Sequence, residues 1–348
     1  MSEVQRVELV PGYSVARIIN GCWQLTPDHG GGPGSEKEIF RIFSEMVELG
    51  FTTFDCADIY TGVEELLGRF RKTLVDPGVI QVHTKFVPDR NTLGQLTAAQ
   101  LEAAVDRSLR RLGVDQLDLV QFHWWNYGVP GMERMTDVLL AAQQRGKIRL
   151  LGVTNFDTGH VRRMLQAGLP LRTLQAQYSL LDRRPERHMT RCCEETGVAL
   201  LPYGVLAGGF LSERYLDQPA PDRMNRSLTK YRLIMDEIGG WDRFQSLLAL
   251  LVEIARAHQT TVDQLAARWV MDQPGVAAII LGTGHRSRAR RNLSLASLEL
   301  PPGTLAPLQQ WLADTPIPPG DMYELERAPD GRHSGIIRTE LNALEGPA

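Results

Sequence analysis

The sequence predicts a (β/α)8 TIM barrel of the α/β class, and three observations support this fold. Short apolar runs alternate with longer amphipathic stretches along most of the 348 residues, which is the pattern of repeated strand–helix units. Eight such units can be counted, the number that closes into a barrel. No Gly-x-Gly-x-x-Gly follows the first apolar run, which disfavours the competing open doubly wound sheet with its dinucleotide site.

The predicted elements follow one another in a regular order. An N-terminal β-hairpin is expected at residues 7–9 and 14–16, ahead of the barrel. The apolar runs predict eight strands, at residues 17–22, 52–55, 79–84, 117–122, 148–153, 173–176, 199–201 and 277–281. The amphipathic stretches predict helices at residues 35–49, 63–72, 97–112, 131–145, 157–166, 186–196, 241–258, 261–272 and 286–298.

Two segments fall outside this rhythm. Residues 206–240 form a long connection after the seventh strand, rich in Gly, Pro and Arg and without a predicted helix; such a loop is uncommon in a compact fold unless it has a function. A C-terminal extension from about residue 302 to 348, rich in Pro and charge, is expected to fold over the barrel or its mouth. We expect a single domain of residues 1–348, with the barrel at about residues 17–298.

Composition excludes several classes of function. The chain has 38 basic and 41 acidic residues, and a net charge of −3 argues against nucleic acid as the main partner. No apolar run reaches the length of a membrane span, and the N-terminus has no signal-peptide core. The four cysteines have no zinc-binding or thioredoxin-type spacing, and Cys192-Cys193 are read as helix neighbours. A reduced, cytoplasmic compartment without a metal site is therefore expected.

Four residues of types that can assist the reduction of a carbonyl fall at or just after predicted strand ends: Asp55, Tyr60, Lys85 and His123. A parallel barrel gathers its strand ends around one mouth, so these side chains are expected to share a site. Singly, each has a duller explanation, such as a capping carboxylate, a rim aromatic, a solvated lysine or a packed histidine. In this order and with these spacings, a shared catalytic role is the better interpretation.

Each of the four can take one role in hydride transfer to a carbonyl, which needs a proton donor and stabilisation of charge at the oxygen. Tyr60 can donate the proton, and a neighbouring ammonium is expected to lower its pKa from about 10. Lys85 can supply that ammonium, and Asp55 can hold it in place. His123 can donate a hydrogen bond that orients the substrate carbonyl.

At this point the sequence resembles the aldo-keto reductase superfamily, closest to its bacterial and potassium-channel-β-like branches. Residues 54–60, Phe-Asp-Cys-Ala-Asp-Ile-Tyr, resemble the family's Asp/Tyr signature, and residues 84–85, Thr-Lys, its lysine motif. Residues 117–124 resemble its histidine motif, and residues 152–156, Gly-Val-Thr-Asn-Phe, its Gly-Val-Ser-Asn-Phe segment. The match runs from about residue 17 to 293 and implies a nicotinamide cofactor extended across the barrel mouth, without a Rossmann domain.

The resemblance also implies which residues hold the nicotinamide end. Thr154, Asn155 and Gln175 match positions that hydrogen-bond the carboxamide, and Tyr203 matches the position that stacks on the nicotinamide ring.

The pyrophosphate path is implied at Gly204, Leu206 and Gly208, through backbone groups. Glycines suit this role because the missing side chain lets N–H groups approach phosphate, although a merely tight turn is also compatible with each of them. The connection after Gly209 is then expected to close over the cofactor as a flap.

The adenosine end departs from the family pattern. Gly282, Gly284, Arg286, Arg288 and Asn292 match the segment that usually carries a basic residue two positions after its first glycine, where this chain has Gly284. Further arginines make this helix start strongly positive, which suits a 2′-phosphate, although a solvated face accounts for some of them. NADP(H) is therefore favoured, with NAD(H) as the alternative.

The substrate side is the least specific part of the sequence. Trp23, Trp124 and Trp125 follow the first and fourth strands and are expected to wall a pocket for a small carbonyl substrate, although buried packing explains Trp125 equally well. The leading function is an NAD(P)H-dependent reductase of an aldehyde or ketone. The alternatives are a cofactor-binding, redox-sensing regulatory subunit and an NAD(P)+-dependent sugar or alcohol dehydrogenase. A homo-oligomer is compatible with all three.

Overall fold

The protein is seen in a computed structural model that describes residues 4–26, 35–284 and 287–341. The strands of these segments are β1 (Arg6–Val10), β2 (Tyr13–Ala16), β3 (Ile18–Gly21), β4 (Thr53–Asp55), β5 (Gln81–Phe86), β6 (Leu117–Phe122), β7 (Ile148–Thr154), β8 (Leu171–Gln177), β9 (Ala199–Tyr203) and β10 (Ile279–Gly282). β1 and β2 form the predicted antiparallel hairpin. Each observed strand lies within a few residues of its predicted position.

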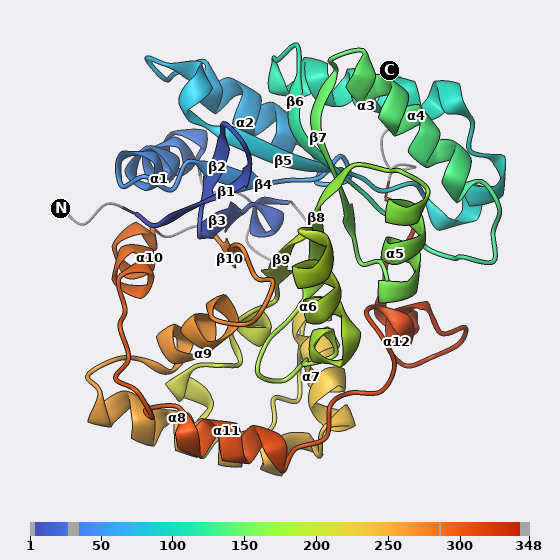
Figure 1. Ribbon diagram of the computed structural model, residues 1–348. Helices are drawn as coiled ribbons and strands as arrows, with labels where there is room; N and C mark the ends of the chain where they lie inside the picture. Colours follow the sequence, from blue (N-terminus) through green and yellow to red (C-terminus); the bar gives the residue numbers. More distant parts are fainter. Residues whose placement is uncertain (1–3, 27–34, 285–286, 342–348) are drawn as a thin grey trace.

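Strands β3 to β10 form one parallel sheet in the order β10-β3-β4-β5-β6-β7-β8-β9. The sheet curls until its two edges meet: the Leu200 backbone N–H of β9 donates to Gly275 O at 2.9 Å, and Leu200 O accepts from Ala277 N at 3.0 Å. Helices surround the strands (Figure 1). The predicted (β/α)8 TIM barrel with an N-terminal hairpin is therefore confirmed.

The helices that follow the strands also lie close to their predicted positions. They are α1 (Glu36–Glu48), α2 (Val63–Arg71), α3 (Ala98–Leu112), α4 (Met132–Gln144), α5 (Thr158–Gln166), α6 (Pro185–Thr196), α8 (Gly240–Ala257), α9 (Val262–Met271) and α10 (Ala289–Ala296). Helix α3 illustrates the local causes: Thr97 and Gln100 form a capping box at its start, and Gly113 ends it with a left-handed φ of 66°. No helix in the described ranges is long and apolar enough to cross a membrane.

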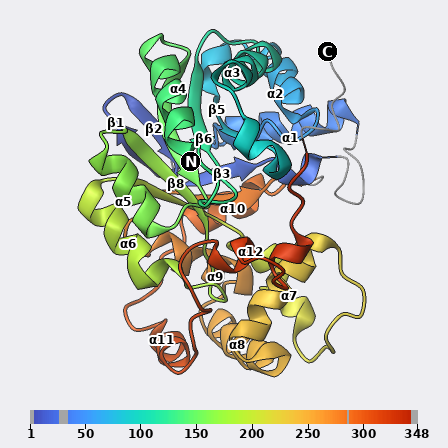
Figure 2. The ribbon, with the colours of Figure 1, turned by 90° about the vertical axis from the view of Figure 1, so that its right-hand side faces the viewer.

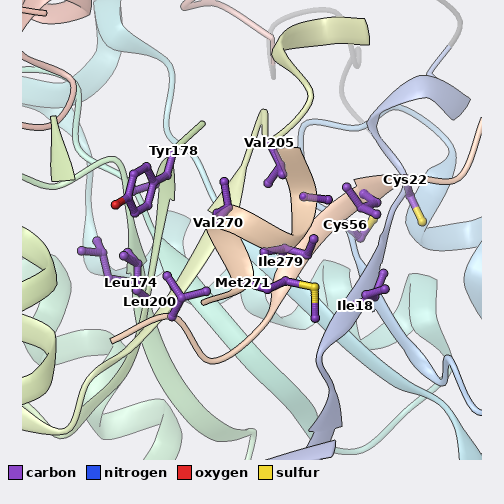
Figure 3. Close-up of a cluster of buried hydrophobic side chains, with 14 of the residues drawn as sticks. Ile18, Cys22, Cys56, Leu174, Tyr178, Leu200, Val205, Val270, Met271 and Ile279 are labelled. Carbon is purple, nitrogen blue, oxygen red and sulfur yellow. The ribbon is translucent and has the colours of Figure 1, made fainter. Parts of the chain in front are cut away.

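Two apolar layers hold the barrel together. Figure 3 shows part of the larger one, where buried Ile18, Leu174, Leu200 and Ile279 from the strands meet Met271 of α9. The smaller layer closes the end of the barrel opposite the carboxyl ends of the strands. There the hairpin packs Tyr13 and Val15 against buried residues of the barrel strands. The carboxyl ends of the strands are therefore the open side, on which a site can form.

The connection after β9 contains a helix that the sequence analysis did not predict. Helix α7 spans Arg226–Glu237, and Asn225 caps it by accepting the Leu228 N–H at 2.9 Å. Its buried face is carried by Tyr231, Ile234 and Met235, with polar and charged residues between them. The prediction of a connection without a helix was wrong, because these apolar positions at helical spacing are few and are obscured by the surrounding Arg, Lys and Gly.

The C-terminal extension lies along the barrel and carries the helices α11 (Ala306–Ala313) and α12 (Glu324–Arg327). Helix α12 lies next to α7, as Figure 2 shows, and the chain beyond it reaches α7 through a hydrogen bond between His333 Nε2 and the Glu237 carboxylate at 3.0 Å. Further on, Leu341 N donates to Asp89 near the mouth at 2.8 Å. The described part of the extension thus runs along the barrel and reaches its mouth, and we propose, as the sequence predicts, that the chain forms a single domain.

A buried ion network anchors α12. Arg184 at the start of α6 is fully buried and contacts Glu326 at 2.8 Å and Asp182 at 2.7 Å. Burial alone raises the pKa of the Glu326 carboxyl, but the Arg184 guanidinium outweighs burial, and the pKa falls to about 2. Because this folded-state pKa lies below the ordinary value of about 4.3, the stabilisation is present above that value and is lost as the pH falls towards 2.

We predict that Arg184→Met destabilises the protein by about 3–5 kcal/mol at neutral pH, because two buried carboxylates lose their counter-ion. Urea denaturation followed by circular dichroism measures the change. Arg145→Met is the matched control, since it breaks only the exposed pair with Glu102 and is expected to cost about 1 kcal/mol or less. Equal losses in the two variants would contradict the importance of the buried network.

Candidate active site

The centre of the site is the carboxylate of Asp55, the last residue of β4. Lys85 of β5 donates from Nζ to both Asp55 oxygens at 2.8 Å and to the Cys56 carbonyl at 2.6 Å. Gln175 of β8 donates from Nε2 to Asp55 Oδ1 at 2.6 Å. Asp55, Lys85 and Gln175 are all buried, so one carboxylate joins three strand ends inside the barrel mouth.

Tyr60 lies in the turn between β4 and α2, where its backbone is held by the hydrogen bonds Tyr60 N to Ala57 O and Val63 N to Tyr60 O. Its ring centroid is 5.1 Å from Lys85 Nζ, and the ring of Trp23 meets it edge-on at 4.9 Å. The structure thus brings Asp55, Tyr60 and Lys85 together, as the sequence predicts.

The direction of the Tyr60 pKa differs from the expectation. Burial, followed by the Asp55 carboxylate, raises the pKa of the Tyr60 hydroxyl well above 10. The pKa is therefore not lowered as expected from Lys85, because burial and the neighbouring carboxylate dominate. Tyr60 is therefore protonated at neutral pH in this state of the protein.

His123, directly after β6, presents an acceptor rather than a donor to the mouth. Its Nδ1 lies 3.0 Å from the Thr154 carbonyl, and because a carbonyl only accepts, Nδ1 must carry the proton. Nε2 is buried without a partner. Burial, followed by the nearby Arg327 guanidinium, lowers the pKa of the ring to about 3, so the ring is neutral. The expectation that His123 donates to the substrate carbonyl does not fit this tautomer.

The residues expected at the nicotinamide end are linked to one another. Tyr203, the last residue of β9, donates to Asn155 Oδ1 at 2.8 Å and accepts from Lys230 Nζ of α7 at 3.2 Å. Asn155 has a φ of 60°, a left-handed conformation that asparagine tolerates better than most residues. Thr154 is buried beside it. Gln175 differs from its expected role in one respect, because its amide N–H donates a hydrogen bond to Asp55.

Two of the glycines expected along the pyrophosphate path lie so close to the side chain of Tyr231 that no larger residue fits. Gly204 and Gly208 have φ values of 68° and 67°, which L side chains rarely adopt. A Cβ on Gly204 would lie 2.6 Å from the Tyr231 hydroxyl, and one on Gly208 would lie 2.8 Å from the Tyr231 ring. Helix α7 thus covers this path in the structure, in the place where the sequence analysis expects a flap.

A small cavity of about 30 Å3 lies where the adenosine end of the cofactor is expected. It is lined by Arg288 and Asn292, both expected there, by Leu206, which was expected on the pyrophosphate path, and by Arg291, which pairs with Asp263. Gly282 lies against the side chain of Gln24, and Gly284 has a left-handed φ of 59°. Arg286 lies outside the described residues.

The three tryptophans expected around the substrate occupy different environments. Trp23 contacts Tyr60, and Trp125 meets the His123 ring edge-on at 4.3 Å. Trp124 is fully buried against Phe122, and its Nε1 donates to Val129 O, because its side chain points into the wall of the barrel. Its burial does not fit the expected direct contact with substrate.

Three residues near the mouth were missed by the sequence analysis: Lys230, Tyr323 and Arg327. They come from α7 and from the C-terminal extension, and no motif or spacing marks them. Tyr323 contacts the His123 ring at 5.6 Å, and Arg327 donates to the carbonyl of Asn155 at 2.7 Å. Only the tertiary structure places these segments beside the tetrad of Asp55, Tyr60, Lys85 and His123.

Comparison with known proteins agrees with this geometry. The model of the aldo/keto reductase family matches residues 17–312. The chain is 27% identical to the NADH-specific methylglyoxal reductase of Escherichia coli over 312 residues, covering 82% of this chain and 91% of that protein. It is also 27% identical over 307 residues to the aldo-keto reductase yakc [NADP(+)] of Schizosaccharomyces pombe, covering 85% of this chain and 88% of that protein.

Among solved structures, a glycerol dehydrogenase from Gluconobacter oxydans shares the fold, with a TM-score of 0.73 at 24% identity, covering 89% of this chain and 96% of that one. The family match, which spans the barrel and all four residues of the tetrad, makes the chain an oxidoreductase of carbonyl and alcohol groups that uses a nicotinamide cofactor. The protein belongs to the aldo/keto reductase family.

Proposed function

We propose that the protein reduces an aldehyde or ketone to an alcohol with NAD(P)H, with Tyr60 as the proton donor. The observation that carries the proposal is the Asp55–Lys85 pair, whose ammonium lies 5.1 Å from the Tyr60 ring at the barrel mouth. The bound nicotinamide supplies the hydride. The chain's own residues supply a proton and hold the substrate oxygen.

Tyr60 fits the direction of reduction. Because its hydroxyl is protonated at neutral pH, it is ready to give a proton to the oxygen on which negative charge develops. The Lys85 ammonium stabilises the tyrosinate that remains, and Asp55 keeps that ammonium in place. Running the reaction towards oxidation would first require removal of the Tyr60 proton, which its raised pKa disfavours.

His123 takes a different part from the one expected of it. A neutral ring with Nδ1 bound to the Thr154 carbonyl offers Nε2 only as an acceptor. In the proposed reaction, Nε2 accepts the hydrogen bond of the alcohol hydroxyl that forms when Tyr60 gives up its proton. The ring therefore orients the oxygen on the product side of the reaction.

The cofactor is proposed to lie from Tyr203, with Thr154, Asn155 and Gln175, along Gly204, Leu206 and Gly208 to the cavity beside Arg288 and Asn292. Arg291 is neutralised by Asp263, so Arg288 is the cation of this cavity that remains for a 2′-phosphate. We favour NADP(H) over NAD(H) for this reason. One of the similar proteins is named as NADH-specific and another is named with NADP(+), so the preference of this chain needs its own test.

We predict that Tyr60→Phe abolishes turnover while leaving cofactor binding nearly unchanged, because only the proton donor is removed. Single-turnover absorbance of reduced cofactor with an aldehyde panel measures the chemistry, and fluorescence titration measures cofactor affinity. Tyr215→Phe, at a partly buried tyrosine of the connection after β9, serves as the control. Undiminished turnover of Tyr60→Phe would reject the proton donor assigned here.

We predict that Arg288→Leu raises KM for NADPH by about tenfold or more and changes KM for NADH much less, since one charge-assisted contact to the 2′-phosphate is lost. Steady-state kinetics with each cofactor provide the measurement. Arg290→Leu in the same helix is the control, because Arg290 is exposed and does not line the cavity. A wild-type protein that prefers NADH would refute the cofactor assignment.

We predict that His123 stays neutral with its proton on Nδ1 between about pH 5 and pH 8, where a free histidine titrates. The pKa of about 3 places the charged form well below this window. Nitrogen-15 NMR of histidine-labelled protein gives both the tautomer and the titration, and His123→Gln assigns the signal. A midpoint within the window, or a proton on Nε2, would show that the ring can donate to the substrate.

A further inference from the structure

The C-terminal extension places an arginine beside the tetrad. Arg327 donates from Nη2 to the carbonyls of Trp124 at 2.9 Å and Asn155 at 2.7 Å. These carbonyls directly follow His123 and Thr154 in the chain, and His123 and Thr154 are themselves hydrogen-bonded to each other. The guanidinium is therefore fixed above the ends of β6 and β7, on the His123 side of the mouth.

Two tyrosine rings flank this guanidinium. Its Cζ lies 4.2 Å from the ring centroid of Tyr127 and 5.2 Å from that of Tyr323. Tyr323 also meets the ring of His123 edge-on at 5.6 Å. His123 and Arg327 thus contact the same tyrosine ring, which lies between them and the mouth residues of α7.

The backbone of Tyr323 is strained at this position. Its φ is 60°, a left-handed value that a bulky aromatic residue seldom adopts. The ion pair of its neighbour Glu326 with Arg184 holds α12 in place, so the strain is maintained by the surrounding structure. Strain of this kind is concentrated at ligand-binding and switching positions.

The charge of Arg327 is left without a counter-ion. Its Nε and Nη1 are buried and have no hydrogen-bond partner, and no ion pair of the described residues includes Arg327. The nearby carboxylates are already engaged, Glu326 with Arg184 and Asp321 with Thr158. Buried N–H groups that lack an acceptor are costly, and a carboxylate matches the guanidinium fork in charge and geometry.

A second cation lies on the other side of Tyr323. Lys230 Nζ is 5.9 Å from the Tyr323 ring centroid and donates to the hydroxyl of Tyr203. Within the described residues, no ion pair joins Lys230 to a carboxylate. The part of the mouth covered by Tyr323 is therefore bordered by two positive groups that come from outside the barrel strands.

We propose that Arg327 is an anion-binding residue of the substrate pocket and that the substrate is a carbonyl compound that also bears a carboxylate. The inference deepens the proposed function and rests on it. The carboxylate binds the free N–H groups of Arg327 once Tyr323 moves aside, and the carbonyl then lies next to His123 and Tyr60. Arg327 is a specificity-determining residue here, and the C-terminal extension is the part of the chain that supplies it.

The experiment compares two aldehydes of nearly equal shape, 4-carboxybenzaldehyde and its methyl ester. For the wild-type protein we expect kcat/KM to favour the carboxylate by about tenfold or more, mainly through KM. In Arg327→Met this ratio is expected to fall to about one, and in Arg327→Lys to an intermediate value because the charge is kept without the fork. The ratio cancels losses that affect both aldehydes equally.

Arg332→Met is the matched control, because Arg332 belongs to the same extension but is exposed and paired with Asp236. It is expected to keep the wild-type ratio. A wild-type ratio near one would overturn the proposal, and so would a ratio that Arg327→Met leaves unchanged. Thermal melting of each variant shows whether it is folded, and Arg327→Lys tests the charge should the Met variant not fold.

Failure of this inference is distinguishable from failure of the proposed function. Reduction of the ester without any preference for the carboxylate would refute only the role of Arg327. If neither aldehyde is reduced, the proposed reaction with this substrate class fails, and calorimetric titration of the cofactor-loaded protein with benzoate and with benzamide still tests the anion site. Binding of benzoate about tenfold tighter than benzamide, lost in Arg327→Met, would support it; equal binding would overturn it.

Discussion

The arrangement of the mouth depends on one buried carboxylate. Asp55 accepts two of the three hydrogen bonds that the Lys85 ammonium donates and one from Gln175, and so joins β4, β5 and β8 where the strands end. A buried charge is tolerated only when it is paired and hydrogen-bonded. The Asp55 carboxylate and the Lys85 ammonium therefore need each other, and Gln175 satisfies a further hydrogen bond of the carboxylate. The position of the ammonium relative to Tyr60 is a consequence of this constraint, and with it the chemistry of the site.

The buried setting of the mouth also shifts the pKa values of two tetrad residues, Tyr60 and His123, away from those of free side chains. Burial and the Asp55 carboxylate raise the Tyr60 pKa in the folded protein, although the Lys85 ammonium lies 5.1 Å from the centroid of the Tyr60 ring. Burial has a similar effect on His123, which becomes a neutral acceptor. In the proposed reaction, these two shifts fit proton donation by Tyr60 and hydrogen-bond acceptance by His123.

Segments outside the strand–helix repeat complete the site. Helix α7 brings Tyr231 against Gly204 and Gly208, and it brings Lys230 to the hydroxyl of Tyr203. Helix α12 brings Tyr323 and Arg327 to His123, and the buried contact of Glu326 with Arg184 holds it there. In the proposed reaction, the barrel supplies the tetrad, and the two added segments border the spaces that we propose for cofactor and substrate.

The sequence by itself determined the eight strand–helix units and the four residues of the tetrad. This was possible because apolar periodicity and strand-end positions are local properties that a barrel converts directly into neighbourhood. It missed α7, the acceptor tautomer of His123, the burial of Trp124, and the approach of Tyr323 and Arg327. These depend on hydrogen bonds and packing between residues far apart in the chain, such as Arg327 with Asn155, and no local pattern encodes such contacts; only the tertiary structure decided them.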